Sequence, residues 1–263
     1  MRDYFKTILN NKSLLWQLTK QELRSRYLGS YLGVFWAFIQ PVLTILIYWF
    51  VFQVGFRTVP INDIPFFLWF MAGIVPWFYF SDAVSAGTYS IMDNTYLVKK
   101  VVFPIQLLSF IKIASSLLVH LFFVAALLIV TFVYQYGFSW YYLQLIYYSA
   151  CLSVLLIGLS WITSSIMVFL KDVGQFVNML LQLLFWLTPI LWNLNVLPAT
   201  LEKAFKLNPL YYIVEGYRDS LFHHIGFWHH AWISCYFWAT VFLILLLGQA
   251  IFKKLRPHFA DVL

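Results

Sequence analysis

The sequence predicts an all-α protein that crosses a membrane several times. Of its 263 residues, 62% are hydrophobic and only 10% are charged, whereas soluble domains carry about 25% charged residues. A water-soluble domain of this size cannot bury so much apolar surface. The apolar residues fall into long segments with few charges. Such segments must be helical in lipid, because every backbone polar group has to be paired there.

Six segments approach the roughly 20 apolar residues that a helix needs to cross a bilayer. They cover residues 31–56, 66–87, 107–134, 141–170, 176–192 and 232–252. The fifth segment is short and contains Pro189 near its end. An even number of crossings places both termini on one side. We therefore expect a single membrane domain over residues 1–263, with an interface helix within 1–30, six spans within 31–252 and a tail over 253–263.

Lysine and arginine are distributed unevenly between the two predicted sides. Twelve lie in the N-terminal lead, the 88–104 and 171–175 loops and the tail, whereas the opposite side has only four: Arg57, Lys203, Lys206 and Arg218. Because short basic loops stay in the cytoplasm, we expect a multi-pass protein of the inner (plasma) membrane with both termini cytoplasmic. Topology and anionic lipid headgroups then account for the net charge of +7 without any nucleic acid partner.

Two segments outside the spans have amphipathic character. Residues 13–27 carry a Glu22/Arg26 pair at i, i+4, which favours an interface helix along the cytoplasmic face. Residues 193–231 are too polar to span and too apolar for a free loop. Pro198 and Asn208-Pro209 divide this segment into short helices. We expect these helices to lie in the outer leaflet or to be re-entrant between the fifth and sixth spans.

No pattern points to catalysis, a bound cofactor or a metal. The chain has no Gly-Lys pair and therefore no ordinary phosphate-binding loop, so any ATP must be bound by a partner. Asp82 and Lys112 lie near the cytoplasmic ends of their segments, where they can pair, snorkel or contribute to a transport path. Four histidines cluster on the outer side without a suitably spaced cysteine or carboxylate: His223, His224, His229 and His230.

Aromatic residues make up 21% of the chain. Most of them are expected to anchor the protein at the membrane interfaces or to face lipid. Trp36 and Trp77 differ, because each lies near a proline within or beside a span. A flat aromatic face contacts the C–H face of a sugar ring without fixing one hydroxyl pattern. We therefore predict a carbohydrate channel lined by four aromatic residues: Tyr31, Trp36, Trp77 and Tyr79.

Four motifs follow one another along nearly the whole chain. The first is a basic lead (Arg24, Arg26) followed by Tyr27, Ser30, Leu32, Gly33, Trp36 and Pro41. The second consists of Gly73, Pro76 and Trp77, and the third of Lys100, Phe103 and Pro104. The fourth consists of Thr188, Pro189, Ile190, Asn208 and Pro209, with Arg218 after it. With these motifs in this order, the chain resembles the permease subunit of ABC-2 type exporters of cell-surface polysaccharide, the group that exports O-antigen, capsule and teichoic acid.

The resemblance implies a homodimer of six-span subunits above two copies of an ATPase subunit. A lipid-linked polysaccharide would pass between the two permeases, since a twofold interface provides room that one chain lacks. Residues 90–100 of the longest internal cytoplasmic loop would form a coupling helix docked on the ATPase. Six residues are expected at or beside that contact: Glu22, Arg26, Asp93, Tyr96, Lys99 and Lys100. The plainer interpretation of the basic loops is that they only fix the topology.

The sequence therefore favours a transport subunit, not an enzyme, with O-antigen as the preferred cargo and capsule or teichoic acid as alternatives. Two functions of other classes stay open. A membrane glycosyl- or phosphotransferase would use Glu215 or Asp219, and it would turn over without a partner. A secondary carrier would couple transport to an ion gradient through Asp82.

Overall fold

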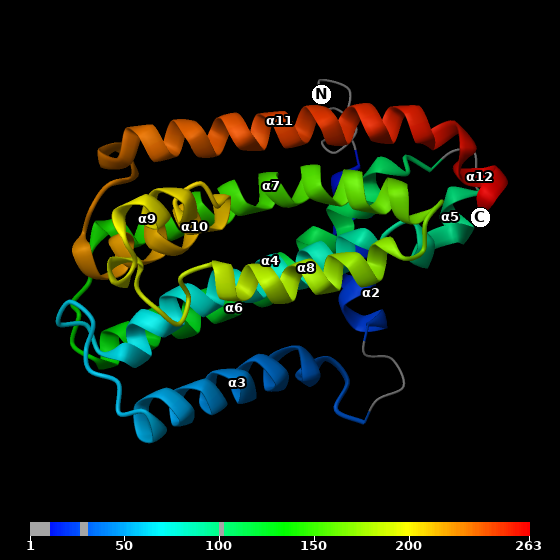
Figure 1. The fold of residues 1–263 in the computed structure, drawn as a ribbon. Helices are drawn as coiled ribbons and strands as arrows, with labels where there is room; N and C mark the ends of the chain where they lie inside the picture. The colour runs from blue at the N-terminus through cyan, green and yellow to red at the C-terminus, as the bar shows by residue number, and fades with distance from the viewer. Residues whose placement is uncertain (1–10, 27–30, 100–102) are drawn as a thin grey trace.

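The computed structural model of the chain describes residues 11–26, 31–99 and 103–263. These parts are helical apart from turns and one isolated bridge between Ile61 and Ile64. The long helices run alongside one another in one bundle (Figure 1). The all-α membrane fold is confirmed, because five helices are long and apolar enough to cross a bilayer: Gly33–Gly55, Phe66–Thr88, Gln106–Val133, Trp140–Met167 and Phe227–Val262.

The helices begin and end close to the predicted boundaries. The first apolar helix has three consecutive parts, a 3₁₀ turn (Gly33–Phe35), α3 (Trp36–Trp49) and a π-helix (Phe50–Gly55). The others are α4 (Phe66–Thr88), α6 (Gln106–Val133), α7 (Gln144–Met167, after a 3₁₀ turn at Trp140–Leu143) and α11 (Ala231–Leu255, after a 3₁₀ turn at Phe227–His230).

The fifth predicted span, residues 176–192, corresponds to α8 (Val173–Leu187). This helix has 15 residues and is about 22 Å long, shorter than the roughly 30 Å hydrocarbon core. The chain leaves the helix at Thr188, whose extended backbone precedes Pro189. Pro189 restricts Thr188 in this way because helical backbone before a proline is disfavoured. The count of six crossings therefore stays a prediction, and α8 is the segment on which it depends.

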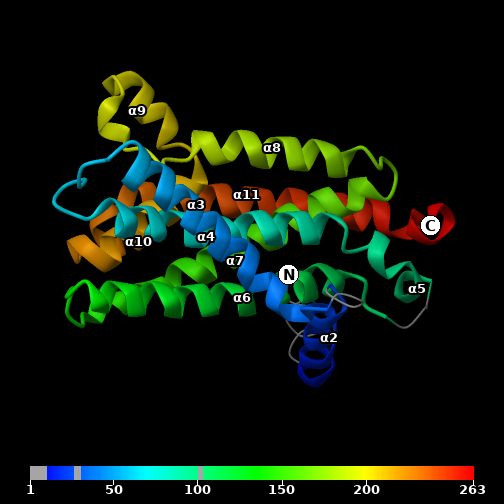
Figure 2. The same ribbon diagram turned by 90° about the horizontal axis from the view of Figure 1, so that it is seen from below.

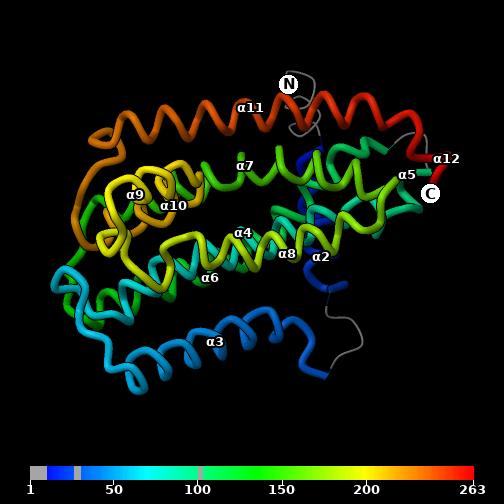
Figure 3. Tube along the Cα trace, viewed as in Figure 1, coloured from blue at the N-terminus to red at the C-terminus, as the bar shows by residue number. Residues whose placement is uncertain are grey.

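The bundle has two distinct ends (Figures 1 and 3). At one end lie α2 (Lys12–Ser25), α5 (Thr95–Val98) and α12 (Phe259–Val262). At the other end lie α9 (Ala199–Phe205) and α10 (Pro209–Arg218). We call these the inner end and the outer end. The segments that the basic-residue distribution assigns to one side thus share one end, and the cytoplasmic location of that end stays a prediction.

The inner end has its own apolar cluster. Leu15 of α2 is buried among Ile91, Val98, Leu107 and Phe259, which come from the loop after α4, from α5, from α6 and from α12. Helix α2 crosses the long helices instead of running parallel to them, as Figures 1 and 2 both show. The amphipathic N-terminal helix expected over residues 13–27 is therefore present, and it is docked on the bundle.

Helix α4 is the centre of the bundle, and α3 is at its edge. Most of α4 is buried against α6, α7, α8 and α10. By contrast, only 11% of the most apolar part of Gly33–Gly55, which contains α3, is buried. Helix α3 stands apart along one side of the bundle (Figure 1). On the opposite side α11 packs on α7, where a Cβ on Gly248 would come within 2.6 Å of the Gly158 carbonyl oxygen. A close backbone approach at this crossing requires glycine.

The outer segment forms the two short helices predicted from its prolines. Helix α9 begins after Pro198. Helix α10 begins with Pro209 at its first position, and the Asn208 side chain accepts a hydrogen bond from the Leu210 amide at 3.0 Å. This cap and the N1 proline are standard helix-start features. Helix α10 turns back onto α4 and α7 and buries Ile213 and Tyr217 completely.

Candidate functional site

The predicted coupling residues lie at the inner end, in two different situations. Tyr96 and Lys99 have exposed side chains around α5, where a partner protein can reach them. The helical part of this loop covers a 3₁₀ turn at Met92–Asn94 and then α5, so it is shorter than the predicted coupling helix over 90–100. Lys100 lies outside the described residues, as do Tyr27 and Ser30 of the first motif.

Glu22 and Asp93 both pair with one buried lysine, Lys112 of α6. The Lys112 ammonium lies 2.8 Å from Glu22 Oε1 and 2.7 Å from Asp93 Oδ2. The Lys112 and Glu22 side chains are 7% and 11% exposed, whereas the Asp93 side chain is 48% exposed. Lys112 was expected near the end of its span, where it could pair or snorkel. In the structure it pairs with α2 and with the loop that leads to α5.

Arg26 also pairs with Glu22 and connects it to Asp82. Its Nε lies 3.1 Å from Glu22 Oε1, which confirms the i, i+4 pair, and its Nη1 lies 2.9 Å from Asp82 Oδ2 of α4. The Arg26 side chain is 17% exposed and the Asp82 side chain 50%. Arg26 Nη2 also approaches Ser116 Oγ of α6 at 3.4 Å. Glu22 and Arg26 thus tie α2 to both α4 and α6.

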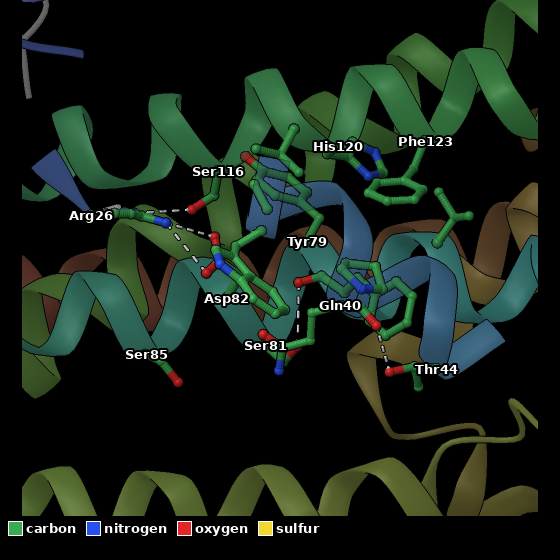
Figure 4. Close-up of a pocket in the computed structure, with 16 residues that line it drawn as sticks. Arg26, Gln40, Thr44, Tyr79, Ser81, Asp82, Ser85, Ser116, His120 and Phe123 are labelled. Atoms are coloured by element: carbon green, nitrogen blue, oxygen red, sulfur yellow. Dashed lines mark hydrogen bonds and ion pairs between the residues drawn. The ribbon is translucent and has the colours of Figure 1, made fainter. Parts of the chain in front are cut away.

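A cavity of about 320 Å³ opens between α3, α4 and α6 (Figure 4). Its wall combines the Arg26–Asp82 pair with aromatic rings, hydroxyl groups and the amide of Gln40. Of the four residues predicted to line a carbohydrate channel, Trp36 and Tyr79 lie in this wall. The cavity is within the usual size range of small-molecule sites. Its aromatic and hydroxyl groups suit contact with a polyhydroxylated ring.

Trp77 lies on the other side of α3, in a more open groove of about 440 Å³ between α3, α4 and α8. Its ring is nearly buried and packs 5.4 Å from the ring of Phe185, centroid to centroid. Trp186 also lines this groove. Tyr31 is fully exposed and lines neither space. A single chain therefore does not bring the four predicted channel residues together.

His120 of α6, which was not among the predicted site residues, lines the 320 Å³ cavity. Its ring stacks on Tyr79 with centroids 4.6 Å apart. Its Nε2 lies 2.9 Å from the Tyr217 hydroxyl and 3.1 Å from Ser149 Oγ. The signal was available, because His120 is the one histidine within a predicted span and intramembrane ionisable residues mark functional or structural polar sites.

At the outer end, Arg218 is the last residue of α10 and is almost completely buried. Its guanidinium carbon lies 3.4 Å from the centre of the Trp69 ring, and Nη1 lies 3.2 Å from Glu215 Oε2. Its Nη2 donates to the Ile190 carbonyl at 3.3 Å. Burial lowers the pKa of Arg218 to about 10, with the nearby carboxylate of Glu215 opposing that shift. The group stays charged at neutral pH and connects α10, α4 and the turn after α8.

Two of the clustered histidines contact the nearly buried carboxylate of Asp219. His223 Nδ1 lies 3.2 Å from one oxygen and His230 Nε2 lies 3.1 Å from the other. The hydrogen bond to Asp219 raises the pKa of His223, and partial burial opposes that shift. Within the described parts of the chain, no group of three or more histidine, cysteine or acidic side chains has the geometry of a metal site. The contacts of Asp219 and Glu215 hold the outer segment together.

Comparisons with known proteins agree with this architecture. The model of the ABC-2 type transporter family matches residues 13–222. An O-antigen export system permease protein, RfbA of Klebsiella pneumoniae, is 30% identical over 256 residues and is covered over 95% of both chains. RfbA of Myxococcus xanthus is 29% identical over 215 residues, 81% of this chain and 82% of the relative. The polysialic acid transport protein KpsM of Escherichia coli is 28% identical over 207 residues, 76% of this chain and 78% of the relative. The chain therefore belongs to the ABC-2 type transporter family of membrane proteins.

Proposed function

We propose that this chain is the transmembrane subunit of an ATP-driven exporter that moves a lipid-linked cell-surface polysaccharide, O-antigen in the first instance, out of the cytoplasm. Two copies form the channel, and two copies of a separate ATPase subunit bind the inner end. The observation that carries the proposal is the similarity to O-antigen export permeases over 95% of both chains. The chain itself acts as a transport subunit and leaves ATP hydrolysis to its partner.

Three features of the structure support this function. Tyr96 and Lys99 present exposed side chains on the loop at the inner end, where a partner can dock. Two aromatic-lined spaces flank α3. Helix α3 itself exposes large apolar side chains such as Leu43 and Ile47, and a second copy of the chain or lipid can cover them. A channel between two copies would bring together aromatic residues that one copy keeps apart.

A capsule exporter is the second candidate, because the polysialic acid transport protein of Escherichia coli is also similar over most of both chains. Teichoic acid export is a further variant of the same function. The transferase alternative would need Glu215 or Asp219 for chemistry, and the carrier alternative would need Asp82. All three carboxylates engage basic side chains of the same chain, an arrangement that favours neither alternative.

The proposal is tested by comparing export in cells that carry Trp36→Ala or Trp232→Ala. Trp36 lines the cavity beside α3, whereas Trp232 is a highly exposed tryptophan at the start of α11 that lines neither aromatic space. Surface polysaccharide should fall in Trp36→Ala and stay at the wild-type level in the matched control. Equal export by both variants would contradict the path along α3. If cells that carry Trp36→Ala keep the wild-type amount of O-antigen but lose capsule, the result supports capsule export instead.

A further inference from the structure

Five charged side chains at the inner end form a continuous series whose charges alternate. The order is Asp93, Lys112, Glu22, Arg26 and Asp82, with successive contacts of 2.7, 2.8, 3.1 and 2.9 Å. They come from the loop before α5, from α6, from α2 and from α4. Figure 4 shows the Arg26–Asp82 part of the series at the edge of the cavity.

The series is buried in the middle and open at both ends. Lys112, Glu22 and Arg26 are largely shielded from solvent, whereas the two terminal aspartates are about half exposed. Two cations face three anions, so the series carries one excess negative charge. Buried ion pairs add little net stability compared with well-packed apolar residues. Leu15 already attaches α2 to the bundle through apolar contacts, so stability alone does not explain the additional charged contacts of this helix.

The two open ends lie at different functional surfaces. Asp93 belongs to the loop whose neighbouring Tyr96 and Lys99 are exposed toward the proposed ATPase. Asp82 lines the 320 Å³ cavity between α3, α4 and α6. Lys112 and Arg26 each bridge two carboxylates, so a change at one end alters the competition for the next cation. In a partly buried series such a change is weakly screened.

We propose that this series is the coupling relay between the ATPase-facing loop and the cavity beside α3, with Lys112 as its central positioning residue. A basic group of the partner near Asp93 would compete with Lys112, which then turns more fully to Glu22. Glu22 in turn releases Arg26 toward Asp82 at the cavity. The relay rests on the proposed ATP-driven function, because it needs a partner that acts on the loop.

The relay is tested with a reporter cysteine in the assembled complex of this chain and its ATPase in lipid nanodiscs. Ser85→Cys places the reporter in the cavity wall, and Cys235→Ser removes the exposed native thiol. The rate of labelling with a water-soluble maleimide is measured with and without a trapped ATP analogue. Nucleotide should change the rate by about fivefold or more, the usual lower range of coupling between sites.

Lys112→Met should abolish the nucleotide response of the reporter while the complex still hydrolyses ATP, and Lys112→Arg should retain the response. Lys206→Met is the matched control, because Lys206 pairs with Glu202 on α9, far along the chain from the relay. A response that persists in Lys112→Met overturns the relay. If Lys112→Met does not assemble, Asp93→Asn at the exposed end replaces it, and an undiminished response in that variant also overturns the relay.

Glycan export by the wild-type complex is scored separately. A wild-type complex that shows the nucleotide response but exports no polysaccharide rejects the proposed cargo and leaves the relay intact. If the wild-type complex exports polysaccharide but its reporter is labelled at the same rate with and without nucleotide, and Lys112→Met does not alter that rate, the relay is rejected and the proposed function is left intact.

Discussion

The two ends of the bundle both hold buried charges, but they hold them differently. At the outer end Arg218 is enclosed by the Trp69 ring, the Glu215 carboxylate and the Ile190 carbonyl. A Cβ on Gly73 would come within 3.0 Å of its guanidinium, so the group lies tightly against α4 on that side. At the inner end, Lys112 and Arg26 each lie between two carboxylates, and the series ends in half-exposed aspartates.

This difference indicates at which end the ion pairs can rearrange. Arg218 has one carboxylate partner, Glu215, and its contacts join three segments of the bundle. Lys112 and Arg26 each contact two carboxylates, so each can shift toward one when the other is engaged elsewhere, as an element that switches requires. We therefore expect the outer end to act mainly as a support of the bundle and the inner end to respond to a partner.

The largest expected effect is on the outer end. Arg218→Leu leaves the Glu215 carboxylate and the carbonyls of Ile190 and Trp69 without their partner, and losing the fully buried cation of such a pair costs about 3–5 kcal/mol. Thermal unfolding in detergent measures the loss. Lys206→Met is the control, because the side chains of its pair with Glu202 are 36% and 31% exposed, and losing a pair that water reaches on both sides should cost less than about 1 kcal/mol. Equal losses in both variants would contradict the support role of Arg218.

A smaller effect on stability is expected at the inner end. Asp82→Asn removes one half-exposed partner of Arg26, which still has Glu22, so the free energy of unfolding should fall by only about 1 kcal/mol. Export by the complex should nevertheless fall, because the cavity end of the relay is lost. The comparison between the two ends fails if Asp82→Asn destabilises the protein as strongly as Arg218→Leu.

The smallest effect concerns pH. The bond to Asp219 raises the pKa of His223 above its ordinary value of 6.5, so protonated His223 stabilises the fold. That contribution is fully present below pH 6.5 and is lost as pH rises through the folded pKa. Glu215, Arg218 and His230 also lie near this pair. The stability difference between wild type and His223→Gln should shrink from pH 5.5 to pH 8.5 by less than about 1 kcal/mol. An increase over this range would contradict the assignment.

The elements of the fold were predictable because they depend on local sequence. The long apolar segments gave α4, α6, α7 and α11 to within a few residues, and Pro198 and Pro209 correctly marked the starts of α9 and α10. Pro189 correctly marked the end of the fifth segment, but apolar composition alone could not show that α8 stops at 15 residues. The position of α3 at the edge of the bundle also has no local signal, because the sequence of this helix is as apolar as that of a buried helix.

The site was only partly predictable, because its contacts join residues far apart in the chain. The Glu22–Arg26 pair follows from helical spacing and is confirmed. The sequence indicated that Asp82 and Lys112 could each form an ion pair, but it did not identify their partners. Asp82 pairs with Arg26, and Lys112 pairs with Glu22 and Asp93. These partners are separated by 19 to 90 positions, so only the packing of α2 across the bundle brings them together.

The most direct test of the account reconstitutes the chain in liposomes that contain the lipid-linked polysaccharide, with and without its ATPase subunit. Translocation is measured as the glycan that becomes accessible to a glycosidase on the opposite side of the membrane. The account predicts ATP-dependent translocation by the complex and none by the chain alone. Translocation or modification of the glycan by the isolated chain, without a nucleotide-hydrolysing partner, would contradict it.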